Sequence, residues 1–206
     1  MKSEIKIIIV LDRSGSMSSV VNETIGGFNS FLNEQKTVEG YAIISLIQFD
    51  HEFEIVYDAI PLQEAQALSK RNYVPRGTTA LLDAIGKTIE LTRKSSKNSV
   101  QLQTKPRIIF VIITDGHENS SIHFSRKKIF ASIRKMEEKH QWQFVYIGAN
   151  QDAIEEASKL GVSQNKALTF YADEEGTNVM FSILNDCVSE CRVSDREFDF
   201  DRKKEN

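Results

Sequence analysis

The sequence predicts an α/β fold, a doubly wound, mostly parallel six-stranded sheet with one antiparallel edge strand and helices on both faces. Apolar runs rich in β-branched residues alternate with segments whose apolar residues recur at helical spacing. The runs are continuously apolar, as at residues 7–10, which is typical of parallel strands covered on both faces. Only Asp50-His51-Glu52 separates the second and third runs, so we expect that pair to form an antiparallel hairpin.

The individual elements follow from these two periodicities. The expected strands, in chain order, are residues 5–11, 42–49, 53–57, 108–113, 144–147 and a weaker run at 167–170. Apolar stripes at three- and four-residue spacing predict helices between them. These stripes cover residues 21–32, 82–89, 129–136 and 180–191. A shorter helix is expected over residues 152–160, where Gly161 provides the stop.

The composition is that of a globular chain and excludes several classes of protein. The 206 residues carry 26 Lys+Arg and 29 Asp+Glu, a formal net charge of −3. This balance argues against nucleic-acid binding through bulk charge, and no apolar run approaches the ~18 residues of a membrane span. We expect one domain over residues 1–192, followed by a charged tail at 193–206. The tail should be flexible unless Phe198 and Phe200 anchor it.

The cysteines and the amino-terminal segment bear on the compartment. Cys187 and Cys191 lie four residues apart in a helical pattern, where side chains on one face are too widely spaced for a disulfide. We therefore interpret them as small core residues. The first apolar run is too short for a secretory signal, so we expect a cytoplasmic protein with no membrane partner. The sequence carries no indication of oligomeric state.

Polar residues gather where two expected strands end. The first strand continues into Asp12, Ser14 and Ser16, and the fourth continues into Thr114-Asp115-Gly116. The loop bearing Thr78-Thr79 enters a helix between them. Ligands of open α/β sheets bind at the carboxyl ends of the strands, so we expect these segments to converge. Carboxylate and hydroxyl oxygens suit a hard cation, which predicts a site for Mg²⁺ or Mn²⁺.

With these three segments in order, the chain resembles the von Willebrand factor type A domains, which carry a metal-ion-dependent adhesion site (MIDAS). The resemblance extends over residues 5–191, and it is greater to the short stand-alone members of bacteria and phages than to the adhesive members. The family's motif positions fall on Asp12, Ser14, Ser16, Thr79 and Asp115, with Thr78 as the alternative to Thr79. The resemblance implies that the hydroxyls bind the metal directly and that the aspartates often act through water. It also implies that an acidic residue of a partner protein completes the octahedron.

The function expected on these grounds is an intracellular metal-dependent protein-binding module, not an enzyme. The alternative is a metal-dependent phosphatase or hydrolase that uses the same site. Phosphatases of the haloacid dehalogenase type need a second aspartate where this chain has Ser14, and no phosphate-binding glycine loop is present. A third interpretation is a structural subunit whose metal site is vestigial.

Simpler roles compete at each position. Asp12, Ser14 and Ser16 are also typical of a helix cap with a turn, Thr79 is also typical of a cap, and Asp115 is also typical of an Asp-Gly turn. Further residues are expected on the rim around the metal, where they would contact the partner. These are Arg13, Arg76, Thr78, His117, Glu118 and Asn150. The two arginines would steer an anionic group of the partner toward the site.

Overall fold

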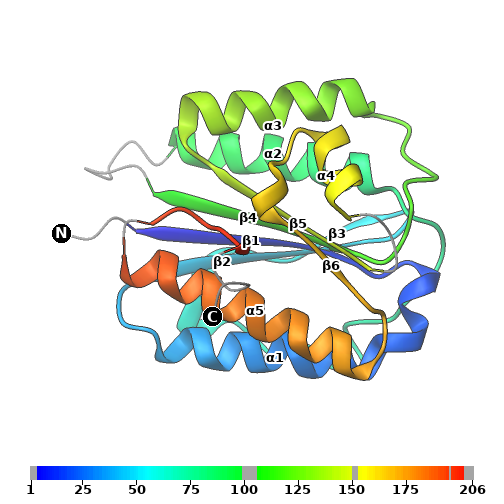
Figure 1. Ribbon diagram of the computed structural model, residues 1–206, viewed down its shortest axis with the longest axis horizontal. Coiled ribbons are helices and arrows are strands. Elements are labelled where there is room, and N and C mark those ends of the chain that lie inside the picture. The colour runs from blue at the N-terminus through cyan, green and yellow to red at the C-terminus, as the bar shows by residue number, and fades with distance from the viewer. Residues whose placement is uncertain (1–3, 99–105, 150–152, 195, 202–206) are drawn as a thin grey trace.

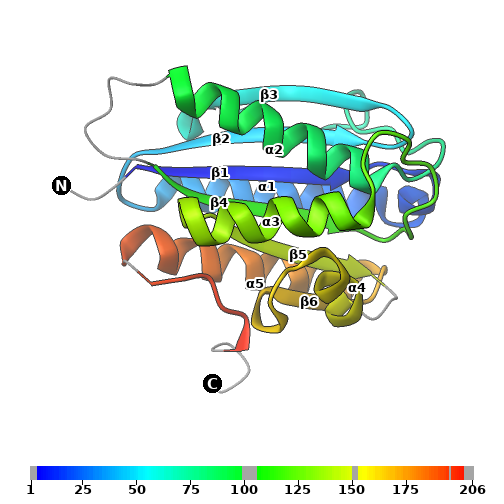
Figure 2. The ribbon, with the colours of Figure 1, turned by 90° about the horizontal axis from the view of Figure 1, so that it is seen from above.

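The computed structural model describes residues 4–98, 106–149, 153–194 and 196–201. Within them the strands are β1 (Ile5–Asp12), β2 (Ala42–Phe49), β3 (Phe53–Pro61), β4 (Arg107–Thr114), β5 (Gln143–Ala149) and β6 (Ala167–Phe170). They form one six-stranded sheet in the order β3-β2-β1-β4-β5-β6, which Figure 2 shows from above. The β2–β3 pair is antiparallel and the other pairs are parallel. The expected fold class and the hairpin are confirmed.

Helices cover both faces of the sheet. They are α1 (Val21–Thr37), α2 (Leu81–Asn98), α3 (Arg126–His140), α4 (Ala153–Leu160) and α5 (Glu174–Val193). Figure 1 shows α1 and α5 on one face, and α2, α3 and α4 on the other. Among the described residues, no helix combines the length and the hydropathy that a bilayer span requires.

The continuous apolar run of β1 is explained by this two-sided cover. Ile7 and Ile9 pack into the hydrophobic cluster beneath α1 and α5. Ile8 and Val10 pack into the cluster beneath α2 and α3. Successive side chains of a strand point to opposite faces, so a strand with helices on both sides needs an apolar residue at every position.

The helix boundaries have ordinary local causes. The Ser125 side chain accepts a hydrogen bond from the amide of Lys128 and caps α3, and Asp173 caps α5 through the amide of Gly176. Helix α4 ends at Gly161, whose φ of +90° is accessible to glycine at low cost. Two short 3₁₀ segments, η1 (Gly15–Val20) and η2 (Leu62–Glu64), lie in the connections that follow β1 and β3.

The structure of the carboxyl-terminal segment differs from the flexible tail that we expected. Phe198 and Phe200 are 0% and 1% exposed, and their rings pack edge to face. The amide of Phe200 donates to the carbonyl of Asn165 at 2.8 Å. The segment over residues 196–201 is therefore docked, because burial of two aromatic rings stabilises it despite the charged residues around them. Cys187 and Cys191 are buried in the same hydrophobic cluster as Phe198 and Phe200, as core residues would be.

The sheet order defines where a site can form. Strand β1 is central, and the chain continues from it to β2 on one side and reaches β4 on the other. Loops that follow β1 and β4 thus leave the same end of the sheet in opposite directions and open a crevice between them. Asp12 is the last residue of β1, and Asp115 directly follows β4.

Candidate metal centre

Asp12 lies at the carboxyl end of β1, where these loops leave the sheet. Its side chain is fully buried, with Oδ1 accepting from the amide of Ser14 at 2.6 Å and Oδ2 accepting from the hydroxyl of Thr114 at 2.5 Å. The Tyr73 hydroxyl donates to the carbonyl oxygen of Asp12 at 2.7 Å. Burial raises the pKa of Asp12 to about 6, and the neighbouring Asp115 adds to the rise. A buried carboxylate with this pKa has a strong electrostatic preference for a nearby positive charge.

Three further oxygens form a chain above Asp12. The Ser14 and Ser16 hydroxyl oxygens lie 3.0 Å apart, and the Ser16 hydroxyl donates to Asp115 Oδ1 at 2.6 Å. Adjacent ligands of an octahedral Mg²⁺ lie about 3.0 Å apart when each metal–oxygen distance is near 2.1 Å. The spacing of the two serines therefore fits two neighbouring positions of such an ion. Burial also raises the pKa of Asp115.

Thr79 approaches the same point from the loop before α2. A Cβ placed on Gly116 would lie 2.7 Å from Thr79 Oγ1 and 3.4 Å from Asp12 Oδ2. The hydroxyl of Thr79 and the carboxylate of Asp12 thus both border Gly116, and any larger residue there would intrude between them. Thr79 is 3% exposed, whereas Thr78 is exposed on the rim. Of the two candidate threonines, the buried Thr79 is the one whose hydroxyl borders Gly116 together with the Asp12 carboxylate.

The loop after β4 is fixed to the start of α2. Asn119 accepts from the amide of Thr79 at 2.9 Å and returns its own amide to the Thr79 carbonyl at 3.1 Å. The Glu118 carboxylate accepts from the amide of Leu82 at 2.9 Å and from the backbone and hydroxyl of Ser121. These bonds position Asp115 and Thr79 relative to each other. The Glu118 oxygens are engaged within the chain, while the role predicted for them toward a partner stays a prediction.

The remaining rim candidates divide by exposure. Arg76 is about half exposed, and Thr78 and His117 are exposed. Arg13 is only 6% exposed, and its guanidinium lies beneath the rim against Asp50. Asn150 lies outside the described residues. The exposed members are accessible at the surface, whereas the side chain of Arg13 is directed into the chain.

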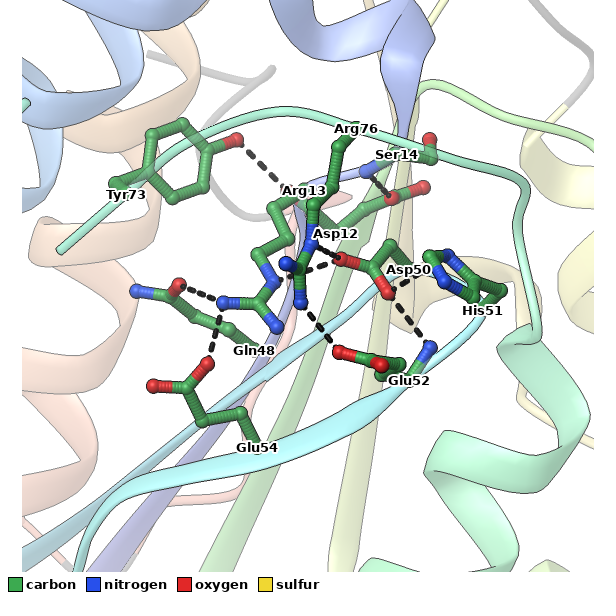
Figure 3. A network of polar contacts seen from close by, with 10 residues as sticks. All are labelled: Asp12, Arg13, Ser14, Gln48, Asp50, His51, Glu52, Glu54, Tyr73 and Arg76. Atoms are coloured by element: carbon green, nitrogen blue, oxygen red, sulfur yellow. Dashed lines mark hydrogen bonds and ion pairs between the residues drawn. The ribbon is translucent and has the colours of Figure 1, made fainter.

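A second cluster of possible ligands lies next to this centre. Side-chain atoms of Asp50, His51 and Glu52 come within 4.8 Å of one another. Figure 3 shows the side chains of Arg13 and Arg76 directed at Asp50, and the Nε atom of each donates to the same Asp50 oxygen at 3.0 Å. Two guanidinium groups at that distance oppose a cation electrostatically. We assign these acidic residues to an ion-pair network.

The sequence reasoning did not single out Asp50, Tyr73 or Thr114. Asp50 directly follows β2, so the same rule of polar residues at strand ends would have found it. Thr114 precedes Asp115 at the strand end, but its position there does not predict the hydrogen bond of its hydroxyl to Asp12. Tyr73 lies in a loop without periodicity, and no sequence signal links its hydroxyl to Asp12.

The centre as a whole offers hard oxygen donors. Asp12, Ser14, Ser16, Thr79 and Asp115 come together from three loops, and no thiol or imidazole belongs to this set. Such donors fit Mg²⁺ or Mn²⁺ rather than a soft metal. The five residues therefore form a chemically coherent candidate site for a divalent cation.

A comparison with known protein families matches the part of the chain that contains the candidate metal centre. The model of the von Willebrand factor type A domain matches residues 6–184. This range includes all three loops of the centre and excludes the docked segment over residues 196–201. No curated protein matches the chain.

Solved structures share the fold at low sequence identity. The manganese-loaded TRAP protein of Plasmodium vivax has a TM-score of 0.53 at 16% identity, covering 86% of this chain and 72% of that one. Proximal thread matrix protein 1 of the mussel byssus, with a zinc-occupied MIDAS motif, has a TM-score of 0.62 at 13% identity, covering 91% and 46%. The pilus adhesin SpaC of Lactobacillus rhamnosus GG has a TM-score of 0.68 at 10% identity, covering 93% and 30%. The chain thus spans less than half of the mussel protein and of the adhesin, and the likeness concerns the fold.

Proposed function

Because the chain belongs to the von Willebrand factor type A domain family, we propose that it is a metal-dependent protein-binding module. In this proposal a divalent cation, Mg²⁺ or alternatively Mn²⁺, sits at the strand ends and coordinates an acidic residue of a partner protein. Asp12, Ser14, Ser16, Thr79 and Asp115 hold the cation. No catalytic step is part of the proposal.

The observation that carries the proposal is the chain of close oxygens above a buried carboxylate. Ser14, Ser16 and Asp115 are linked by contacts of 3.0 Å and 2.6 Å, and Asp12 lies buried beneath them. Hydroxyl ligands carry no charge, so they leave much of the positive charge of a cation uncompensated. A bound cation would supply the electrophilic centre to which a partner's carboxylate binds.

The residues of this chain prepare the site before any partner arrives. Thr114 and the amide of Ser14 fix both oxygens of Asp12, so that carboxylate has one orientation. Asn119 holds Thr79 through its backbone amide. Preorganised donors lose little conformational entropy on binding, which favours affinity. Exposed residues at the rim, Arg76, Thr78 and His117, would then set specificity for the sequence around the partner's acid.

The related structures support a divalent metal in this fold without identifying the one used here. The TRAP protein was solved with manganese, and the mussel protein with zinc in its MIDAS motif. SpaC is a pilus adhesin, which is consistent with a binding role for the fold. The partner of this chain, and the acidic residue within it, are part of our proposal.

The proposal is tested by capture of a partner from the native host. The tagged wild-type protein should retain a protein in Mg²⁺ and lose it in chelator, and Asp12→Ala should retain nothing in either condition. Ser19→Ala is a matched control, because Ser19 is an exposed hydroxyl of the same loop outside the donor set. Capture that is insensitive to chelator and to Asp12→Ala would contradict the proposal and favour a vestigial site. Metal-dependent hydrolysis of a phosphate ester, lost in Asp12→Ala, would favour the enzyme alternative instead.

A further inference from the structure

Asp50 connects two of the loops that build the metal centre. Its side chain is fully buried, and Oδ2 accepts from Nε of Arg13 and from Nε of Arg76, each at 3.0 Å. Arg13 stands between Asp12 and Ser14 in the sequence, and Arg76 lies in the loop that leads to Thr79. In Figure 3 the two guanidinium groups approach Asp50 from two different segments of the chain. One carboxylate thus holds an arginine from each of these two ligand-bearing loops.

Backbone contacts join the same two loops. The amide of Arg76 donates to the carbonyl of Arg13 at 2.9 Å, and the amide of Gly15 donates to the carbonyl of Gly77 at 3.1 Å. The amide of Ala80 donates to the carbonyl of Asp50 at 2.9 Å. The side chain of Asp50 and the main chain of both loops therefore form one connected unit directly beside the ligand oxygens.

The charges of this unit favour a single arrangement. Burial alone would raise the pKa of Asp50, but the amide of Glu52 and the two arginines outweigh it and hold the pKa below its usual value. Asp50 is therefore ionised at neutral pH, balancing part of the charge of Arg13 and Arg76. Glu54 pairs with Arg13, and Glu52 pairs with Arg76, on the outer side. Planar guanidinium groups held this way have little rotational freedom.

We infer that Asp50 is a positioning residue, which holds the loop over residues 12–16 against the loop over residues 76–79 so that their oxygens converge on one cation. The inference rests on the proposed function, because it concerns the affinity of that same site. It adds Asp50 and its two arginines to the residues that determine metal binding, although none of the three touches the cation.

The effect of removing Arg76 on cation affinity distinguishes a positioning role from a purely electrostatic one. Removing Arg76 takes away a positive charge near the site, so electrostatics alone would tighten the binding of a cation. Loss of positioning would weaken it. Weaker binding in Arg76→Ala therefore cannot be attributed to its change of charge. Arg76 is about half exposed, so this variant should fold even where Asp50→Asn, which removes the buried negative charge beside Arg13, does not.

The experiment is calorimetric titration with Mn²⁺ alone, together with amide hydrogen exchange of the metal-free proteins. We expect Asp50→Asn and Arg76→Ala to bind Mn²⁺ about 10- to 100-fold more weakly than wild type. The amides of Gly15 and Arg76 should also exchange faster. Arg134→Ala is the matched control, since its side chain is 47% exposed and pairs with Glu138 at 2.9 Å on the remote helix α3. It should bind Mn²⁺ as wild type does.

Each outcome decides one of the two claims. Wild-type affinity, or tighter binding, in Arg76→Ala would overturn the positioning role and leave the proposed function standing. Absence of Mn²⁺ binding by the wild-type protein would overturn the proposed function. In that case the hydrogen-exchange rates alone test whether Asp50 holds the two loops together. Unchanged exchange in Arg76→Ala would then overturn the positioning role as well.

Discussion

The Ser16 hydroxyl donates a hydrogen bond to Asp115 at 2.6 Å, although the two residues lie 99 positions apart in the chain. They meet because β1 and β4 are parallel neighbours in the sheet, paired from Ile5 with Arg107 to Leu11 with Ile113. Loops that leave adjacent parallel strands emerge at the same edge. The strand order therefore brings the oxygens of the candidate metal centre together, although they lie in separate loops of the chain.

The two adjacent glycines of α1 should respond oppositely to alanine. A Cβ on Gly27 would lie 2.2 Å from the ring of Phe181 on α5, whereas a Cβ on Gly26 meets nothing within 4 Å. Gly27→Ala should therefore destabilise the protein by about 1–3 kcal/mol, because α1 and α5 must separate. Gly26→Ala should stabilise it by up to about 1 kcal/mol through helix propensity. Urea unfolding of both variants measures this, and equal effects would contradict the packing of α1 on α5.

The docked carboxyl-terminal segment should contribute to stability. Phe198 is 0% exposed, so Phe198→Ala should lower the free energy of unfolding by about 3–5 kcal/mol. Phe130→Ala is the control, because Phe130 is 44% exposed and should lose much less on truncation. A Phe198→Ala variant as stable as wild type in thermal unfolding would show that residues 196–201 are loosely held in solution.

Asp83 should make the protein sensitive to acid. Burial raises its pKa, but the backbone amides of Ile122, Phe124 and His123 outweigh burial and hold the pKa below the ordinary value of 3.8. A carboxylate whose pKa is lower in the folded state contributes stability above its unfolded pKa, and that contribution is lost as the pH falls further. Wild type should therefore lose more stability than Asp83→Asn between pH 6 and pH 3, by up to about 1 kcal/mol. Parallel pH profiles of urea unfolding for the two proteins would contradict this.

Much of the fold was predictable because its periodicities are strong. Strands β2 and β6 have the predicted bounds, and the other strands extend the predicted runs by a few residues. The short Asp50-His51-Glu52 connection was sufficient to place β3 as the antiparallel strand. The segment over residues 196–201 is docked rather than flexible because the rings of Phe198 and Phe200 are buried. The charged composition of the whole tail does not reveal the effect of these two residues.

The sequence was sufficient to predict that the candidate donors converge, but not which residues support them. Asp12, Ser14, Ser16 and Asp115 follow strand ends, and topology alone brings such positions together. That rule does not predict the direction in which a side chain points. Arg13 lies between two predicted ligands but turns beneath the rim toward Asp50, and Glu118 turns inward to the start of α2. Both directions depend on tertiary partners from distant parts of the sequence.

We propose that this chain binds a divalent cation through the oxygens at the ends of β1 and β4. The most direct measurement is calorimetric titration of the purified protein with Mn²⁺ and with Mg²⁺, comparing wild type with Ser16→Ala and with Ser19→Ala. We predict one metal-binding site per chain in wild type and in Ser19→Ala, and loss or strong weakening of metal binding in Ser16→Ala. Absence of binding by wild type at millimolar metal, or equal binding by Ser16→Ala, would contradict it.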